Sequence, residues 1–419
     1  MSLTPVPPPG RLWTRLLALA AIGATARGGV NRQALSDEDI AACRQLIAWG
    51  DEAGLHPSLD AAGNLFLTLK SARPAAAPLV MGSHLDTQPT GGKFDGALGV
   101  LAALEAAAAL ARQPSAPDRD VVVAAWMNEE GGRFAPGMMG SEVFTGERTL
   151  AWIREVVDGA GTRVGDALDR MRDALGEVER VPAGFAVGHY LELHIEQGPV
   201  LEAQGIDIGV VTGIQGKKTF EVELRGTEGH AGTLQMSARQ DALVAFNRIA
   251  VALDAAVGAH DEAVKFTIGR VRVEPNAPSV VPGRVTFSID LRHPDNATLE
   301  RLGAVVRQTC ERLAAPCAAT VRALVDSPSN AFDPDLRSAI AAAAEKLGRS
   351  AMPLMSAAGH DARHLAKVCP SAMIFVPCRA GISHSESEWI EADQAAAGLD
   401  VLFEVAAQLV LSHRSEGSS

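Results

Sequence analysis

The chain has 419 residues, of which 47% are hydrophobic and 21% are charged, a composition typical of a folded globular protein. Its 38 basic and 50 acidic residues give a formal net charge of −12, which argues against nucleic acid or an anionic membrane as a partner, since both require a basic footprint. The length exceeds what one hydrophobic core usually supports, so two domains are expected.

Cysteine usage and the N-terminal region predict a cytoplasmic protein. No C-x-x-C pair occurs among the five cysteines, so free thiols in a reducing compartment are expected. Arg11 and Arg15 precede the apolar run LLALAAIGATA, which has the features of a signal peptide. An amphipathic first helix of the mature fold is the favoured interpretation, because unpaired cysteines fit export poorly. No apolar run reaches membrane-spanning length.

Helices and strands alternate along the first half of the chain. Residues 11–57 are expected to form two helices around a turn, with the second starting at residues 36–39. The stretch 97–111 predicts a helix that is too apolar to be exposed and must pack on a sheet. This alternation is typical of a layered α/β domain. The expected strands are 64–69, 79–81, 121–127 and 190–199.

A different pattern occupies residues 213–325 and indicates an inserted α+β domain. Its expected strands are 219–224, 265–273 and 284–291, and its expected helices are 239–255 and 297–313. The first pattern then resumes with a strand at 372–376 and helices at 334–347 and 394–411. We therefore predict a discontinuous domain of residues 1–212 and 326–419 that is interrupted by a domain of residues 213–325.

Histidines and carboxylates recur where the apolar strands end. Each one alone is better explained by a surface hydrogen bond or a solvated turn, but their recurrence at five places favours a dinuclear metal site. Three histidines with carboxylates suit Zn²⁺ or Mn²⁺ better than Ca²⁺ or Mg²⁺, which prefer oxygen ligands. Adjacent carboxylates point in different directions, so one of them can bind metal while the other handles a proton. The residues concerned are His84, Asp95, Glu129, Glu130, His194 and His384.

Six motifs in this chain resemble those of the M20-type metallo-amidohydrolases, in the hydantoinase/carbamoylase branch. They are GSHLDTQPTGGKFDG, NEEGGRF, LELHIEQGP, GHAG, AAGHDA and IFVPCRAGISH. The resemblance extends from about Leu12 to Leu411. It implies an αβα catalytic domain with a binuclear site, and an inserted domain that acts as lid and dimerisation domain of a homodimer. Two divalent ions per subunit are implied, Zn²⁺ or Mn²⁺, with Co²⁺ or Ni²⁺ also compatible.

The resemblance also implies roles for individual residues. Asp95 would bridge the two ions, Asp86 would orient His84, and Glu129 would be the general base. The implied metal ligands are His84, Asp95, Glu130, His194 and His384.

Five further residues are implied to contact the substrate, namely Gln197, His230, Asn276, Arg292 and His360. His230 would reach the neighbouring subunit's site and hold the substrate carbonyl, while Asn276 and Arg292 would grip the substrate carboxylate. From the residues alone, an ion pair with Asp290 or Asp295 is the preferred explanation for Arg292, and a capped loop histidine is the preferred explanation for His360.

The chain departs from the family pattern beside the substrate, where Thr233, Leu234 and Gln235 replace a proline-containing stretch and Glu386 follows Ser385. None of these changes removes an implied ligand or the base, so they bear on the substrate. The predicted activity is hydrolysis of an N-carbamoyl amino acid to the amino acid, ammonia and CO₂. The alternatives are an allantoate or ureidoglycolate amidohydrolase, an aminopeptidase or deacylase of the same fold, and an inactive binding protein.

Overall fold

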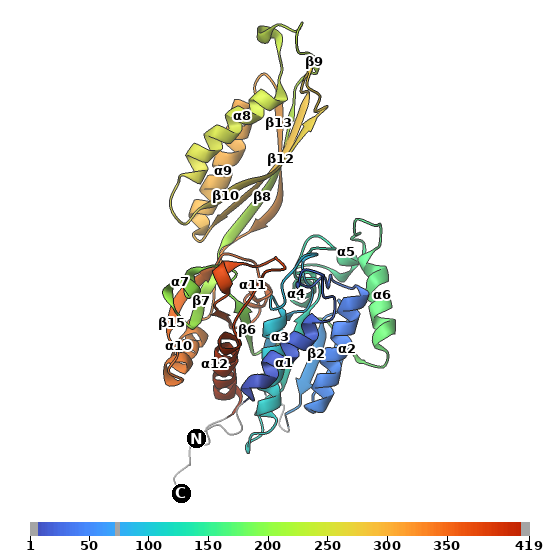
Figure 1. Ribbon diagram of the computed structural model, residues 1–419, viewed down its shortest axis with the longest axis vertical. Coiled ribbons are helices and arrows are strands. Elements are labelled where there is room, and N and C mark those ends of the chain that lie inside the picture. Colours follow the sequence, from blue (N-terminus) through green and yellow to red (C-terminus); the bar gives the residue numbers. More distant parts are fainter. Residues whose placement is uncertain (1–6, 72–75, 412–419) are drawn as a thin grey trace. The chain divides into compact units, whose positions relative to one another are not determined.

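The computed structural model describes residues 7–71 and 76–411. The chain divides into two compact units, the first comprising Met1–Gly213 and Phe332–Ser419 and the second comprising Ile214–Ala331. Figure 1 shows the helices and strands of each unit.

The first unit combines helices with a mixed sheet. Its helices are α1 (Pro9–Ala20), α2 (Asp37–Glu52), α3 (Ala97–Leu110), α4 (Met139–Phe144), α5 (Leu150–Arg154), α6 (Val164–Leu175), α7 (Val200–Gln204), α10 (Pro334–Lys346), α11 (Ala362–Leu365) and α12 (Ala392–Val410), with a 3-10 turn η3 (Arg379–Gly381). Its strands are β1 (His56–Asp60), β2 (Leu65–Leu69), β3 (Leu79–His84), β4 (Val121–Trp126), β5 (Glu179–Val181), β6 (His189–Ile195), β7 (Ile208–Ile214), β15 (Ala351–Ser356) and β16 (Ser371–Val376).

Four parallel strands form the centre of this sheet. The order along it is β7-β16-β6-β3-β4-β2-β1-β5, and β15 also pairs with β7. Strands β16, β6, β3 and β4 run parallel to one another, whereas β2 is antiparallel to β4 and to β1. The predicted α/β class is therefore confirmed. Because the parallel strands share a direction, their carboxyl ends lie along one edge, which is where α/β sheets usually place their sites.

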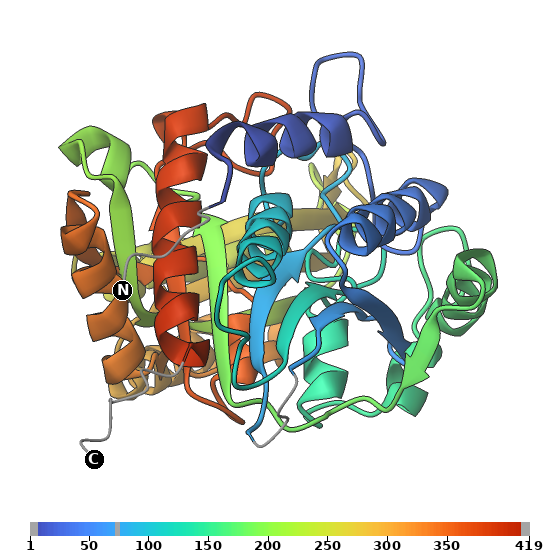
Figure 2. The ribbon, with the colours of Figure 1, turned by 90° about the horizontal axis from the view of Figure 1, so that it is seen from below.

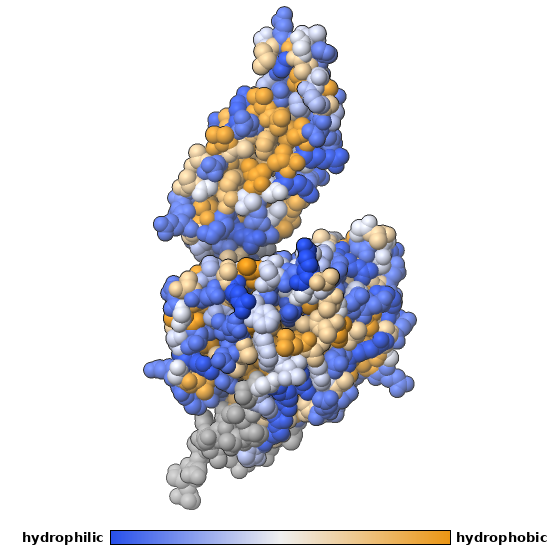
Figure 3. All heavy atoms as spheres, viewed as in Figure 1, coloured by the Kyte–Doolittle hydropathy of each residue, from blue (hydrophilic) through white to orange (hydrophobic). Residues whose placement is uncertain are grey.

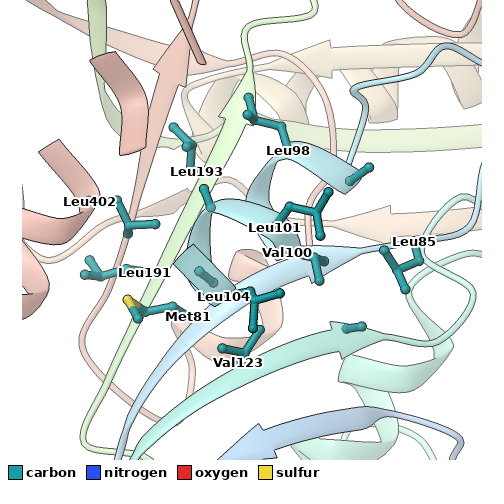
Figure 4. Packing of buried hydrophobic residues seen from close by; sticks show 14 of the residues in the cluster. Met81, Leu85, Leu98, Val100, Leu101, Leu104, Val123, Leu191, Leu193 and Leu402 are labelled. Carbon is teal, nitrogen blue, oxygen red and sulfur yellow. The ribbon is translucent and has the colours of Figure 1, made fainter. Parts of the chain in front are cut away.

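Helix α3 is fully buried and forms the middle of the core. Together with α12 it covers one face of the central strands (Figure 2). Leu98, Leu101 and Leu104 of α3 lie among leucine, valine and methionine side chains from the sheet and from α12 (Figure 4). Burying each such side chain contributes about 1.5–3 kcal/mol. This continuous burial explains why almost every residue of the helix is Ala, Leu or Val.

Helix α1 belongs to the folded core, as the sequence predicted. Leu12 and Leu16 have no exposed surface. Arg11 and Arg15 each bind the fully buried carboxylate of Glu105 on α3, at 2.6 and 2.8 Å. These leucines and ion pairs attach α1 to the interior of the first unit. Among the residues that the structure describes, no helix has the length and hydropathy needed to cross a bilayer.

Strand β6 is buried on both faces, although polar residues alternate with apolar ones along it. Leu191 and Leu193 do face the core beneath α3, but Glu192 and His194 on the other face are also buried. The reason is α11, which covers that face and donates the Ala362 N–H to Glu192 at 3.1 Å.

The second unit is a four-stranded antiparallel sheet with two helices on one face. Its sheet order is β10-β12-β8-β13, and α8 and α9 pack against the sheet. Helix α8 starts later than predicted because Asp241 caps it by accepting the N–H groups of Leu243 and Val244. Strand β13 was not predicted, because as an edge strand it alternates only weakly. The elements are β8 (Gly216–Arg225), β9 (Gly229–His230), η1 (Met236–Ala238), α8 (Ala242–Leu253), the π-helix η2 (Asp254–Gly258), β10 (Lys265–Glu274), β11 (Val280–Val281), β12 (Arg284–His293), α9 (Asn296–Leu313), β13 (Ala318–Ser327) and β14 (Asn330–Ala331).

Candidate metal centre and active site

Two groups of histidine and carboxylate side chains meet at the carboxyl edge of the parallel strands, and they share Asp95. The first group is His84, Asp95 and His194, whose potential ligand atoms all lie within 4.8 Å of one another. Asp95 Oδ1 is 3.1 Å from His194 Nε2 and 3.6 Å from His84 Nε2. All three residues are at most 3% exposed.

The second group is Asp95, Glu130 and His384, again within 4.8 Å. The other carboxylate oxygen of Asp95, Oδ2, is 3.5 Å from His384 Nε2, which in turn lies 3.1 Å from Glu130 Oε2. The hydrogen bond that His384 donates to the Glu130 carboxylate raises the pKa of His384 to about 9, although burial opposes this. Each oxygen of Asp95 thus faces a different group, as a carboxylate that bridges two cations must.

Hydrogen bonds hold the two buried histidines in one orientation. His84 Nδ1 lies 2.9 Å from the carbonyl of Asp86, and His194 Nδ1 lies 2.9 Å from the carbonyl of Ile195. A ring that donates its Nδ1–H to a carbonyl leaves Nε2 unprotonated and free to coordinate a cation. Both Nε2 atoms face Asp95. This arrangement is typical of metal-binding histidines.

The backbone at these strand ends is built for sharp turns. Gly96 has φ +65°, and a Cβ there would lie 2.4 Å from the ring of His84, so only glycine fits between Asp95 and the start of α3. Asn128, Gln197 and His384 also adopt left-handed φ values of 53–55°. Such conformations cost free energy in residues with a side chain and concentrate at functional sites.

The two adjacent carboxylates after β4 take different positions. Glu130 belongs to the second group, while Glu129 Oε2 lies 3.7 Å from His84 Nε2. The carboxylate of Asp86 accepts the backbone N–H groups of Glu129 and Glu130 at 3.1 and 3.2 Å. Its nearer oxygen is 3.7 Å from His84 Nδ1. In this structure, Asp86 therefore contacts His84 through its backbone carbonyl, and its carboxylate fixes the Glu129–Glu130 turn.

The electrostatics of the cluster show an excess of buried negative charge. Burial raises the pKa of Glu129 well above its usual value, with the charge of Asp361 adding to the effect and that of His84 opposing it. Burial disfavours the charged form of His84, but the carboxylates of Glu129 and Asp95 outweigh it and raise the pKa of the ring. For Asp95, burial alone would raise the pKa, yet His194 and His84 lower it well below its usual value.

The donor set fits two divalent cations. Imidazole with carboxylate donors suits Zn²⁺ or Mn²⁺, and cations would replace the protons that the histidines otherwise hold. A third combination, Glu192 with His194 and His360, also has its potential ligand atoms within 4.8 Å. Both oxygens of Glu192 are already used, however, accepting from Ser83, from Tyr190 and from the backbone of α11. The two groups that share Asp95 are therefore the candidate centre.

The remaining predicted residues fall in two places. In the first unit, Gln197 Nε2 donates to Asp95 Oδ2 at 2.9 Å, while the buried Gln197 Oε1 has no partner among the described residues. His360 is 1% exposed and packs edge-on against His194, with 4.5 Å between ring centroids. In the second unit, His230 and Asn276 are exposed.

The third predicted residue of the second unit, Arg292, makes a side-chain ion pair. Its Nε donates to Asp290 Oδ1 at 2.7 Å. This is the contact that the residues alone suggested, and it leaves the implied role in substrate binding as a prediction.

Three residues next to this centre escaped the sequence analysis. Gln88 Nε2 donates to Glu130 Oε2 at 2.9 Å, Ser383 Oγ donates to Asp95 Oδ2 at 2.7 Å, and Glu388 is buried beside Asp95. Gln88 and Ser383 lie inside the quoted motifs, so their nearness to the ligands in sequence was an available signal. Nothing local distinguishes Glu388 from a surface glutamate.

Comparisons with known proteins agree with this arrangement. The model of peptidase family M20/M25/M40 matches residues 80–408. The chain is 44% identical over 398 residues to an N-carbamoyl-L-amino-acid amidohydrolase of Rhizobium meliloti, covering 94% of each. It is 34% identical over 400 residues to an allantoate amidohydrolase of Bacillus subtilis, covering 93% of this chain and 95% of that one. A crystal structure of a hydantoinase/carbamoylase family amidase from Burkholderia multivorans is similar with a TM-score of 0.87 and 40% identity, over 97% of this chain and 98% of that chain.

The fold and the site together define an amidohydrolase, in a class of hydrolases that generally depend on metal ions. The chain belongs to peptidase family M20/M25/M40.

Proposed function

We propose that this chain hydrolyses the carbamoyl C–N bond of an N-carbamoyl amino acid, releasing the amino acid, ammonia and CO₂. One observation carries the proposal: Asp95 joins two ligand groups, with the spare carboxylate of Glu129 beside them. The 44% identity to an N-carbamoyl-L-amino-acid amidohydrolase supports the choice of substrate.

The residues of the site suit this reaction. Two divalent cations held by the groups around Asp95 would supply Lewis acidity and favour a nucleophilic water near neutral pH. Glu129 takes a proton from the attacking water as the water oxygen adds to the ureido carbon, and it passes that proton to the nitrogen of the amino acid as the C–N bond breaks. The carbamic acid that remains then breaks down to ammonia and CO₂. Asp86 fixes the turn that carries Glu129, so the base stays in place between the two steps.

The second unit (unit 2, Ile214–Ala331) supplies the groups proposed to hold the substrate. Arg292 would bind the substrate carboxylate with Asn276, since a guanidinium matches a carboxylate in a two-pronged geometry. In the structure Arg292 donates a hydrogen bond to Asp290, which also lies 3.2 Å from Lys217. A bound substrate carboxylate would therefore compete with Asp290 for the guanidinium of Arg292. His230 would reach the site of the neighbouring subunit, with unit 2 acting as its lid.

The same proposal includes a homodimer formed through unit 2. Helix α8 exposes Leu243, Val244 and Val251, which are 39, 52 and 67% exposed, and apolar residues gather over this helix in Figure 3. Burying such a stripe against a second copy would remove it from water. Sedimentation of the wild type and of Val251→Glu tests this: a dimer that the substitution dissociates is expected, and a wild-type monomer would contradict it.

The experiment that tests the function is ammonia release by protein loaded with Zn²⁺ or Mn²⁺. The substrates are N-carbamoyl-L-amino acids, N-carbamoyl-β-alanine and allantoate. An N-acetyl amino acid and a dipeptide serve as controls, and their cleavage is measured as release of free amine. Turnover of the carbamoyl compounds is expected, and Glu129→Gln should lower it by at least about 100-fold, as expected for a general base. Turnover of allantoate alone would favour the second candidate, which the similarity to an allantoate amidohydrolase supports.

Two other outcomes would overturn the proposal. Free amine from only the acetyl or peptide controls would indicate an aminopeptidase or deacylase. No bound metal and no turnover would indicate a binding protein.

A further inference from the structure

Glu388 is a buried carboxylate that accepts hydrogen bonds from the loop that carries Asp95. It is 2% exposed and lies four residues after His384. Its Oε1 accepts the backbone N–H of Phe94 at 2.9 Å and that of Asp95 at 3.1 Å. A buried carboxylate is costly unless donors satisfy it, and here the donors are the amides that set the position of Asp95.

A second link runs through Ser383. Its hydroxyl donates to Asp95 Oδ2 at 2.7 Å and lies 3.2 Å from Glu388 Oε2. Glu388 therefore contacts both the backbone of Asp95 and, through one hydroxyl, the carboxylate oxygen that faces His384. That oxygen belongs to the second ligand group.

The surroundings of Glu388 are shaped to receive it. A Cβ at Gly92 would lie 2.0 Å from the Glu388 carboxyl carbon and 2.1 Å from Oε1, so only glycine leaves room for the carboxylate. On the other side the rings of Phe94 and Trp389 pack edge to face, with 5.5 Å between centroids. Residues adjacent to Glu388 and to Asp95 thus hold the two segments together.

We propose that Glu388 is a positioning residue for the metal centre, because it fixes Asp95 between the two ligand groups. This rests on the proposed role of Asp95 as the shared ligand and goes beyond it, since Glu388 contacts none of the other ligand side chains in the described structure. Groups that orient metal ligands typically change metal affinity by about 10- to 100-fold when they are removed.

The test measures Mn²⁺ binding to the metal-free wild type, Glu388→Ala and Glu388→Gln. The electron paramagnetic resonance signal of free Mn²⁺ reports how much of the ion remains unbound. Glutamine has no charge but keeps the oxygen that accepts both amides. If Glu388 acts by positioning Asp95, Glu388→Ala should bind Mn²⁺ at least about 10-fold more weakly than the wild type. The Mn²⁺ affinity of Glu388→Gln should stay within about threefold of the wild-type affinity. Equal losses in both variants would mean that only the charge acts, and the proposal would fail.

A matched control lies two residues away. The side chain of Glu386 is also held by polar contacts, because Thr25 Oγ1 donates to it at 2.6 Å and Arg27 Nε lies 2.5 Å from it. Neither of these partners is a candidate metal ligand. Glu386→Ala should therefore leave Mn²⁺ affinity close to that of the wild type. A loss equal to that of Glu388→Ala would indicate a general effect on the loop and would overturn the proposal.

Two more variants keep the test decisive if Glu388→Ala does not fold. Ser383→Ala removes only the hydroxyl link, and Gly92→Ala displaces the Glu388 carboxylate without deleting it. Both should weaken Mn²⁺ binding, and wild-type affinity in both would refute the proposal. Because no substrate is used, the result stands even if no ureido compound is hydrolysed. A wild type that binds no Mn²⁺ would overturn the metal centre and this inference together.

Discussion

Gly96→Ala is the substitution for which the structure gives the sharpest expectation. Gly96 has φ +65°, and a Cβ there would lie 2.4 Å from Cε1 and Nδ1 of His84 and 2.5 Å from Nε2. With ψ −50° this backbone lies outside the left-handed helical region, so an alanine there should cost more than the about 1–2 kcal/mol of that region. Ordinary van der Waals contact begins at 3.4 Å, so the His84 ring must move by about 1 Å (3.4 − 2.4), a displacement that costs about 100-fold in rate when a catalytic group is misplaced.

The control is Gly205→Ala, at the end of α7. Gly205 has a nearly identical φ of +64°, but a Cβ there would meet nothing within 4 Å. Gly205 has ψ 35° and lies in the left-handed region, so Gly205→Ala should lose about 1–2 kcal/mol in urea unfolding of the metal-free protein, and Gly96→Ala should lose more. Only Gly96→Ala should lose metal affinity and about 100-fold in kcat/KM for the ureido substrate. If Gly96→Ala keeps kcat/KM within about threefold of Gly205→Ala, the reasoning about the His84 ring is wrong.

Three further predictions concern stability. Burial alone would raise the pKa of Glu147, but His364 and Lys367 lower it from 4.5 to about 2. The shift corresponds to about 3 kcal/mol by linkage, and because 28% of the side chain is exposed, screening reduces this to about 1–2 kcal/mol. A lowered carboxyl pKa stabilises above pH 4.5, so urea midpoints of the wild type and Glu147→Gln should differ constantly at neutral pH and converge as the pH falls from 4.5 toward 2. A difference that grows in acid would contradict this. Leu101→Ala in α3 should cost about 2–5 kcal/mol by urea unfolding, whereas Leu347→Ala, at a site 39% exposed, should cost under about 0.5 kcal/mol. Removing metal with a chelator should lower the midpoint of thermal unfolding, and Zn²⁺ at 100 times its Kd should restore about 2.7 kcal/mol. An unchanged midpoint would argue against a bound ion.

The parts of the fold that could be predicted are those whose signal is local. Buried parallel strands such as β3 and β4 are continuous apolar runs, and α3 is a long apolar helix, so each stands out within its own residues. Helices α4 and α5 have six and five residues, which is too short for a helical period to appear. No residue of strand β13 is fully buried, so its sequence lacks the alternation of buried apolar and exposed polar residues that marks a strand.

The same distinction applies to the candidate site. His84 and His194 lie at the carboxyl ends of β3 and β6, and Asp95 lies just before α3, so the positions of the two histidines in the sequence already indicate the sheet edge. The burial of Glu192 depends on α11, which is distant in sequence. The contact of Glu388 with Asp95 joins residues 293 positions apart. Pairings of this kind depend on tertiary packing, and nothing in the local pattern signals them.

The two ligand groups also differ in exposure, although they share Asp95. His84 and His194 have almost no exposed surface, whereas the side chain of His384 is 50% exposed. A cation held by Glu130 and His384 would therefore be nearer to solvent and would exchange faster than one held by His84 and His194. Asp95 directs one oxygen toward each group, and Oδ2 also contacts Gln197 and Ser383. These contacts would keep the carboxylate in place if only His84 and His194 held an ion, which would favour stepwise rather than cooperative metal loss.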